Sequence, residues 1–223
     1  SIFKKAGALK MIEGGHIAGR TGNWDSQFEP YVPEYKDGKK TRVQYPMSSP
    51  RAQNFYKQFI PSLTAHLKEQ QMGEIYAQHI ADEPISSNIK SYVEIARFIK
   101  QLAPEIKIIE ACHSHDLENT LDIWVPQLNF YKDGYDFYRE RQKQGDEVWF
   151  YTCLAPQGDF ANRFLEQPLI KTRLIHWLNF KYGATGYLHW GFNQWFANND
   201  PYKETTLMNT ESGNTLPGGD SWI

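Results

Sequence analysis

Apolar and polar positions divide the chain into short hydrophobic runs separated by longer polar stretches. Six of the runs are rich in β-branched or aromatic residues, which predicts buried strands. Most are continuous rather than alternating, and parallel strands covered on both faces have that pattern. The expected strands lie at residues 8–12, 75–81, 106–111, 123–125, 147–152 and 186–190.

Helical patterns lie between several of these strands. Residues 48–50 (Ser-Ser-Pro) are typical of a helix start, because proline suits the first turn. Phe55, Phe59 and Leu63 follow at helical spacing and are the expected buried face, while Pro61 predicts a kink or a break. Further helices are expected at residues 87–102, 135–143 and 168–182. Their expected buried residues are Tyr92, Ile95, Ile99 and Leu102 in the first of these and Leu174, Ile175 and Leu178 in the last, which Gly183 caps.

The alternation of strands and helices predicts an α/β fold with a parallel sheet. A (β/α)8 TIM-type barrel typically takes ~250 residues. Six strands in 223 residues therefore predict a barrel that is incomplete at its N-terminus. Residues 19–49 have the pattern of a long loop, with an Asp-Gly turn at 37–38. A doubly wound open sheet is the alternative, although no Gly-rich phosphate loop follows any strand. We expect one domain over residues 1–223, cut from a longer protein. The chain starts without a methionine and runs quickly into an expected strand, and it stops just as a new apolar segment begins.

Composition narrows the possible partners. The formal net charge is −2, and the one dense basic cluster surrounds the expected turn at 37–38, so it favours a solvated loop tip over a nucleic-acid site. No apolar run approaches the ~20 residues of a membrane span. Cys112 and Cys153 are too few for a disulfide framework. The aromatic fraction of 15% is high and suits a large core, a sugar-stacking cleft, or both.

Two adjacent acids, Asp82 and Glu83, follow the expected strand at 75–81 and precede Pro84. Strand ends are where α/β enzymes keep catalytic groups. Pro84 ends the strand and favours extended geometry at Glu83, which lets both acids face one cleft. Because two close carboxylates repel, one of them should keep its proton to higher pH and can act as a general acid. An exposed acidic pair in a turn is the other interpretation.

Several other strand ends carry hydrogen-bonding or aromatic side chains, which is the pattern of a sugar cleft. Aromatic faces cover the apolar patches of a pyranose, while amide and imidazole groups bind its hydroxyls. Core packing or plain loop polarity explains any one of these residues equally well. The substrate-binding candidates are His16, Gln127, Tyr135, Tyr151, Trp190 and Asn193.

A metal-dependent hydrolase is a further alternative. His113 and His115 lie close to Cys112 and Asp116, and such residues bind zinc. No second cluster with matching spacing accompanies them, and no G-x-S-x-G nucleophile motif occurs. We therefore predict no metal and no cofactor.

Four segments together resemble the catalytic domain of glycoside hydrolase family 123. They are HIADEP (79–84), DIWVPQL (122–128), EVWFYTC (147–153) and GYLHWGFN (186–193). The resemblance extends over nearly the whole chain in the same order. It implies a (β/α)8 barrel, usually preceded by a β-sandwich domain that this chain lacks. It also implies the activity of a β-N-acetylgalactosaminidase and a periplasmic or secreted location.

The resemblance implies a substrate-assisted mechanism, one of the exceptions to the two-carboxylate scheme. The acetamido oxygen of the sugar attacks its own anomeric carbon, Asp82 orients and stabilises the acetamido group, and Glu83 is the general acid and base. Tyr151 is expected to hydrogen-bond the acetamido carbonyl, and Trp190 to form the wall under the sugar. The predicted function is a retaining exo-enzyme that removes terminal β-linked N-acetylhexosamine from glycans or glycolipids. A non-catalytic carbohydrate-binding protein is the alternative from a different class.

Overall fold

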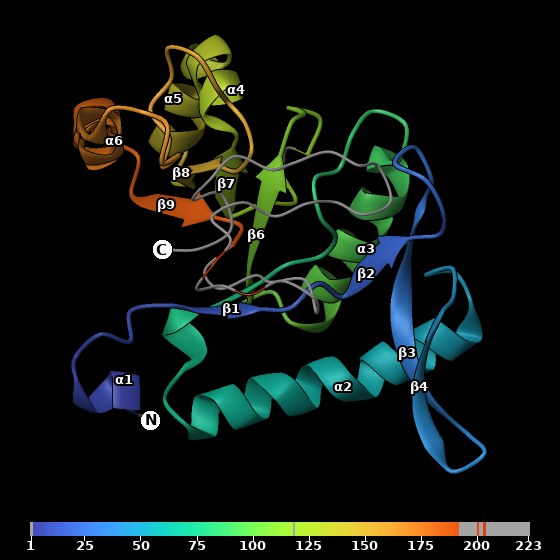
Figure 1. Cartoon of the computed structure of the whole chain (residues 1–223). Helices are drawn as coiled ribbons and strands as arrows, with labels where there is room; N and C mark the ends of the chain where they lie inside the picture. Colours follow the sequence, from blue (N-terminus) through green and yellow to red (C-terminus); the bar gives the residue numbers. More distant parts are fainter. Residues whose placement is uncertain (1, 118, 192–199, 201–202, 204–223) are drawn as a thin grey trace. The chain divides into compact units, whose positions relative to one another are not determined.

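A computed structural model describes residues 2–117, 119–191, 200 and 203 (Figure 1). The chain divides into two compact units, Ser1–Ile123 and Trp124–Ile223, which are taken in turn below. The first unit contains α1 (Ile2–Lys5), β1 (Ile12–Gly14), β2 (Ala18–Arg20), β3 (Phe28–Lys36), β4 (Lys39–Gln44), α2 (Pro50–Glu69), the 3-10 turn η1 (Gly73–Ile75), β5 (Tyr76–Gln78), α3 (Ile89–Leu102) and β6 (Lys107–Cys112). β7 (Ile123–Pro126) starts at the boundary, and α4 (Leu128–Asp133), α5 (Tyr135–Lys143), β8 (Glu147–Thr152), α6 (Leu169–Tyr182) and β9 (Gly186–His189) follow.

The larger sheet has six strands in the order β1-β5-β6-β7-β8-β9. The pairs β1–β5, β5–β6 and β8–β9 are all parallel, and helices connect strands along the chain. The α/β class with a parallel sheet is therefore confirmed, as are five of the six predicted strands. The first expected strand was misplaced: residues 8–11 are irregular, and β1 starts at Ile12. Residues 8–11 have the apolar composition of a strand, but they are exposed or half-buried and form no strand pairing with any described residue.

A second, antiparallel sheet of β2, β3 and β4 corrects the expected loop at 19–49 (Figure 1). In β3 the buried positions alternate, with Phe28, Pro30 and Val32 facing inward. The two prolines of β3 hide this alternation in the sequence because proline is rare inside sheets. The turn at 37–38 is confirmed: Asp37 and Gly38 join β3 to β4 with φ angles of 52° and 73°, the type I′ geometry that suits a hairpin.

The helix α2 begins as predicted but buries a different face. The Ser49 hydroxyl caps it by accepting a hydrogen bond from the Ala52 N–H (3.2 Å). The expected break at Pro61 is wrong, since the helix continues to Glu69. Its buried residues are Ala52, Tyr56, Ile60 and Leu67, so the expected face of Phe55, Phe59 and Leu63 lies one position off. Phe55 and Phe59 stack on each other (5.5 Å), and Phe59 is exposed.

The helix α3 supplies much of the core of the first unit. Tyr92, Ile95 and Ile99 are fully buried, as predicted, and Leu102 is half-buried. Tyr92 lies edge-on to Phe28 of β3 (6.3 Å). The helix therefore contacts both sheets, since the Tyr92 hydroxyl also donates to Glu110 of β6 (3.3 Å).

The second unit packs aromatic side chains between its helices and strands. Phe150 of β8 stacks on Tyr131 of α4 (5.9 Å). Trp124 is fully buried and donates from Nε1 to Asp146 (2.8 Å). α5 matches its prediction, while α4 was not predicted because it is a single short helix directly after a strand.

The helix α6 corrects a predicted apolar face. Gly183 caps it with a φ of 71°, as expected. Of its residues Ile175 is buried, Leu178 is half-buried, and Leu174 is exposed against the prediction. Apolar residues occur on every side of α6, so the sequence does not define which face is buried.

Candidate active site

The strands β1, β5 and β6 bring together a group of charged residues at and near their C-terminal ends, namely Glu13, His79 and Glu110. Glu110, in β6, has a side-chain exposure of 0%. Its Oε2 accepts hydrogen bonds from the backbone N–H of Ile80 (2.8 Å) and of Ala81 (3.0 Å), and from the hydroxyl of Tyr92 (3.3 Å). Its Oε1 lies 2.8 Å from Nδ1 of His79. Residues just ahead of Asp82 are therefore tied to a neighbouring strand by one buried carboxylate.

His79 links that carboxylate to a second one. Its Nε2 lies 3.2 Å from Oε2 of Glu13, which is in β1. Burial on its own would lower the pKa of His79, but the hydrogen bonds with Glu110 and Glu13 outweigh it and raise the pKa to about 10. The imidazole is therefore charged at neutral pH and donates from both nitrogens. Burial would likewise raise the pKa of Glu110, yet the hydrogen bonds from His16 and His79 lower it, so Glu110 is ionised.

Glu83 lies beyond the end of β5 in an unusual backbone conformation. Its φ is 45°, a left-handed geometry that costs ~1–3 kcal/mol in residues other than glycine. The extended geometry expected from Pro84 is therefore wrong. Nη2 of Arg20 donates to the Glu83 carbonyl (2.9 Å), and Oε1 of Glu83 lies 3.3 Å from Nε2 of His113. These contacts hold both the main chain and the side chain of Glu83, whose side-chain exposure is 18%.

Asp82 is exposed when its whole surface is considered. Its carboxyl group nevertheless loses part of its hydration to the surrounding protein atoms. This loss of hydration is the main reason that its pKa is raised, and the charges of Glu83 and Glu110 add to it. His16 and Arg20 act in the opposite direction. The two acids thus occupy different surroundings, as an acid–base pair requires.

Arg20 is held by Trp24, in the loop after β2, and by Phe28, the first residue of β3. Its guanidinium lies 3.7 Å from the ring centre of Trp24 and 5.0 Å from that of Phe28, and its Nε donates to the Trp24 carbonyl (2.9 Å). Burial lowers the pKa of Arg20, and the charges of Asp82 and Glu83 raise it. Arg20 is thereby fixed as a positive charge beside the acidic pair.

His16, predicted to bind substrate, belongs to this cluster. Its Nε2 lies 3.5 Å from Oε1 of Glu110, and its side chain is 41% exposed. His16, His79 and Glu110 each offer an atom that could bind a metal, and these atoms lie within 4.8 Å of one another. The 2.8 Å between His79 and Glu110 is a hydrogen-bond length, and the other oxygen of Glu110 already accepts three donors. Hydrogen bonding therefore accounts for the cluster without an ion.

The other predicted substrate-binding residues that the structure describes lie in the second unit. Gln127 directly follows β7 and forms a parallel bridge with Tyr151 near the end of β8. Tyr151 is buried, and it lies on the strand face opposite Phe150, which packs on α4. Trp190 follows β9 and is 44% exposed.

Tyr135 and Asn193 stand apart from this group. Tyr135 starts α5, and its ring meets the rings of Tyr131 (6.1 Å) and Tyr182 (5.5 Å). The contacts of Tyr135 are thus with α4 and α6 rather than with a strand end. Asn193 lies outside the described residues.

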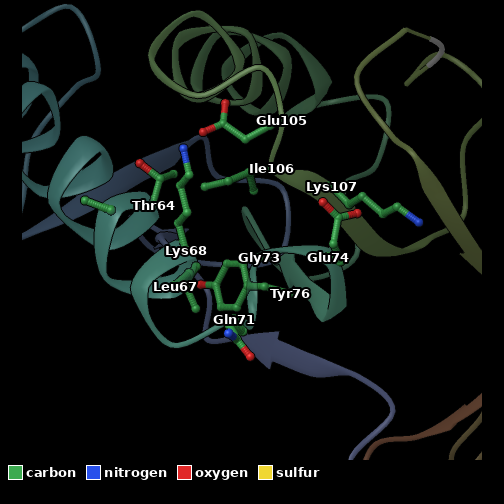
Figure 2. A pocket seen from close by; sticks show the side chains of 11 residues that line it. Thr64, Leu67, Lys68, Gln71, Gly73, Glu74, Tyr76, Glu105, Ile106 and Lys107 are labelled. Atoms are coloured by element: carbon green, nitrogen blue, oxygen red, sulfur yellow. The ribbon is translucent and has the colours of Figure 1, made fainter.

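A pocket of about 670 Å³ lies at the opposite ends of the strands (Figure 2). It includes Tyr76 and Lys107, the first residues of β5 and β6. Asp82 and Glu83 follow the last residue of β5, so this pocket is separate from the acidic pair. A second pocket, of about 400 Å³, is lined by Tyr131, Tyr135 and Tyr182 between the helices of the second unit.

Sequence reasoning did not single out Glu13, His79, Glu110 or Arg20 as residues of the candidate site. Glu110 was treated as part of an apolar strand, although a charged residue inside such a run is itself a signal, because a buried charge requires partners. Arg20 fell in a segment expected to be a loop and carried no signal. His113 was considered as a metal ligand, whereas the structure places it against Glu83.

Two neighbouring acids in different surroundings beyond the end of a parallel strand are compatible with acid–base chemistry of the kind that glycosidases use. The family model of the glycoside hydrolase 123 catalytic domain matches residues 3–223. The chain therefore belongs to the glycoside hydrolase 123 catalytic domain family, which is a class of glycosidase.

Comparison with solved structures gives the same fold. A family 123 glycoside hydrolase from Clostridium perfringens, studied for glycolipid glycan hydrolysis, matches with a TM-score of 0.70 and 19% sequence identity. The match covers 99% of this chain and 38% of that one, so this chain spans less than half the length of that protein. No curated protein matches the chain significantly. Among the described helices, none has both the length and the hydropathy to cross a membrane.

Proposed function

We propose that this chain carries the catalytic centre of a retaining, substrate-assisted exo-β-N-acetylgalactosaminidase. Its substrate is terminal β-linked N-acetylhexosamine on a glycan or glycolipid. The relative from Clostridium perfringens, with its link to glycolipid glycans, supports the substrate class. The proposal extends to the complete fold, a (β/α)8 barrel that forms one catalytic domain, with a β-sandwich domain of the same protein preceding it.

The observation that carries the proposal is that two neighbouring acids differ in burial and in their partners. Glu83 is largely enclosed and paired with His113, while Asp82 is exposed, with a pKa that is raised mainly by lost hydration. A glycosidase needs one carboxyl group that gives up a proton and another that stabilises positive charge. The two acids therefore have different surroundings, which a division of these roles requires. The raised pKa of Asp82 alone would favour Asp82 as the protonated group, so the assignment of Glu83 as the acid rests on the family motif and on the enclosed position of Glu83.

In this mechanism the acetamido oxygen of the substrate attacks the anomeric carbon and forms an oxazolinium ion. Glu83 gives its proton to the departing oxygen and then takes one from the incoming water, which opens the ion with overall retention. Asp82, as a carboxylate, accepts a hydrogen bond from the acetamido N–H and stabilises the cation. Because the nucleophile is tethered to the sugar, its effective molarity is high and the protein needs no nucleophile of its own.

The remaining predicted residues bind the sugar in this proposal. Tyr151 donates its hydroxyl to the acetamido carbonyl, and Trp190 stacks against the apolar face of the ring. Polar contacts to sugar hydroxyls are assigned to His16, Gln127, Tyr135 and Asn193. Of these, Tyr135 has the least support, because its described contacts are with helices.

Hydrolysis of an aryl β-N-acetylgalactosaminide tests the proposal. Turnover is expected for the wild type, and Glu83→Gln should lower kcat about 10³-fold, in the range that general acid–base catalysis contributes. The aryl β-galactoside is the matched control substrate, since it differs by replacing the acetamido nucleophile with a hydroxyl. It should not be turned over.

Azide gives an independent check on the variant. It should restore little activity to Glu83→Gln, because no sugar becomes linked to the enzyme. Full activity in Glu83→Gln, or equal turnover of the galactoside by the wild type, contradicts the proposed function. The aryl β-N-acetylglucosaminide, assayed in parallel, determines which epimer is preferred.

A further inference from the structure

Glu110 is a charged residue in the middle of an apolar strand, with a side chain that is fully enclosed. An isolated buried carboxylate is strongly unfavourable, so its partners must be good. They are: three donors on Oε2, from Ile80, Ala81 and Tyr92, and two imidazoles at Oε1, from His79 and His16. So complete a set of partners indicates a defined role for Glu110.

The two backbone donors show what Glu110 does to the chain. Successive N–H groups of a regular strand point in opposite directions, so two neighbouring ones cannot reach the same atom. Ile80 and Ala81 both donate to Oε2, which means that the strand has ended there. The register of β5 with β6 indeed stops at Gln78. The carboxylate replaces the strand ladder at the point where the chain turns toward Asp82.

The same segment is held from its other side by the chain that follows β1. The Ala18 N–H donates to the carbonyl of Ile80 (2.8 Å), and the Ile17 N–H donates to that of His79 (3.3 Å). Residues 79–81 are therefore fixed from both sides immediately before the acidic pair. Within the part of the chain that the structure describes, the hydrogen bonds between β6 and residues 79–81 all involve the Glu110 side chain.

We propose that Glu110 is the positioning residue of the catalytic pair, an inference that rests on the proposed function. It does not contact the sugar. Through Ile80 and Ala81 it fixes where the main chain leaves β5, and so where Asp82 and Glu83 present their carboxyl groups. Its partners His16 and His79 hold the carboxylate itself in place. A displacement of 1 Å in such a group can cost about 100-fold in rate.

Replacing Glu110 by Gln keeps the shape and removes the charge, and it presents an NH₂ group to atoms that are themselves donors. We expect kcat/KM for the 4-nitrophenyl β-N-acetylgalactosaminide to fall about 100-fold, mostly in kcat. Glu105→Gln is the matched control, since it changes the same charge at an exposed position just before β6. It should leave kcat/KM unchanged.

The dependence of activity on the leaving group distinguishes a positioning role of Glu110 from a general disturbance of the fold. The phenyl glycoside needs protonation by Glu83, whereas the 2,4-dinitrophenyl glycoside departs with little help. If Glu110 positions the acid, Glu110→Gln should lose more activity on the phenyl than on the dinitrophenyl substrate, in the same direction as Glu83→Gln. A loss that is equal for both substrates, in a protein with wild-type folding by circular dichroism, overturns the inference.

A second variant covers the case in which Glu110→Gln fails to fold. Tyr92→Phe removes one donor from Oε2 and keeps the buried ring. The loss of this one weak hydrogen bond should reduce kcat about threefold, with the same steeper dependence on the leaving group. A Tyr92→Phe enzyme with wild-type dependence then overturns the inference.

The outcomes distinguish this inference from the proposed function. If Glu83→Gln is inactive but folded Glu110→Gln keeps wild-type kcat/KM, the role of Glu110 is wrong and the function stands. If Glu83→Gln is active, the function fails first. Elemental analysis gives a further outcome: one divalent metal ion per protein, together with activity lost to a chelator, would make the cluster a metal site and overturn positioning by hydrogen bonds.

Discussion

Both ends of the parallel strands in the first unit are rich in charged residues. These residues are exposed at one end and buried at the other. At the starting ends of β5 and β6, Lys68, Glu74, Glu105 and Lys107 line an open pocket and are all exposed (Figure 2). At the finishing ends, Glu110 and His79 are buried within one hydrogen-bonded network. Charge alone therefore does not locate the site. What distinguishes the candidate site is buried charge beside a residue, Glu83, with a left-handed backbone conformation.

This difference has an energetic meaning. Exposed ion pairs contribute ~0–1 kcal/mol, because water competes for both partners. A buried charge that loses its partner costs several times more. Substitutions at the finishing ends should therefore change catalysis and pH response strongly, while equivalent substitutions at the starting ends should change little. The predictions below test that contrast in order of expected effect.

The largest effect is expected from Asp82→Asn. The amide cannot stabilise the developing cation as a carboxylate does, so kcat should fall about 10²–10³-fold, as when one preorganised electrostatic partner is removed. The loss should be similar for phenyl and dinitrophenyl glycosides, because Asp82 does not protonate the leaving group. Steady-state kinetics with both substrates measure this. An Asp82→Asn enzyme with more than half of wild-type kcat contradicts the assigned role.

Arg20→Ala should have an intermediate effect. Arg20 donates to the carbonyl of Glu83, and loss of a hydrogen bond from a charged donor costs about 1.5 kcal/mol, or about tenfold in kcat/KM if the strain at Glu83 is relieved. Arg42→Ala is the matched control, because Arg42 also lies over an aromatic ring, that of Tyr31 (4.2 Å), but in β4. Equal kinetics for the two variants would show that the contact with Glu83 has no part in catalysis.

His79→Gln should change the pH dependence of stability. The pKa of His79 is raised to about 10 by Glu110 and Glu13 against the effect of burial. Its stabilising contribution is thus fully present below pH 6.5, the unfolded value, and is lost as pH rises through about 10. The free energy of unfolding should fall in this interval by up to about 1.4 kcal/mol per pH unit.

Urea denaturation between pH 6.5 and 9 measures that slope. The slope should be flatter in His79→Gln and unchanged in His66→Gln, which replaces an exposed histidine of α2. A wild-type slope in His79→Gln would contradict the charged state of this imidazole.

The sequence was informative wherever one physical signal dominated. The strand at β8 matched its prediction because it is a short, dense apolar run, and α3 because one face of the helix is consistently apolar. The prediction failed where two helix faces are equally apolar. In α2 these are the faces of Phe55 and of Tyr56, and packing against β3 and α3 selects the second. The two prolines of β3 concealed that strand, because proline is rare inside sheets.

The site was predictable in part. Asp82 and Glu83 stand out as candidates in the sequence because they directly follow an apolar run and precede a proline. The left-handed conformation of Glu83 could not be predicted, because it depends on Arg20, which lies 63 positions away in the chain. The network around Glu110 depends likewise on β1, β5 and β6 meeting in space, which no spacing along the chain encodes.

The central claim is that Glu83 and the substrate's own acetamido group carry out a double displacement beside Asp82. Proton NMR of the sugar released from a β-N-acetylgalactosaminide tests it most directly. The account predicts that the β-anomer appears first with the wild-type enzyme, and that Glu83→Gln releases sugar about 10³-fold more slowly. Initial release of the α-anomer, or release by Glu83→Gln at the wild-type rate, would contradict it.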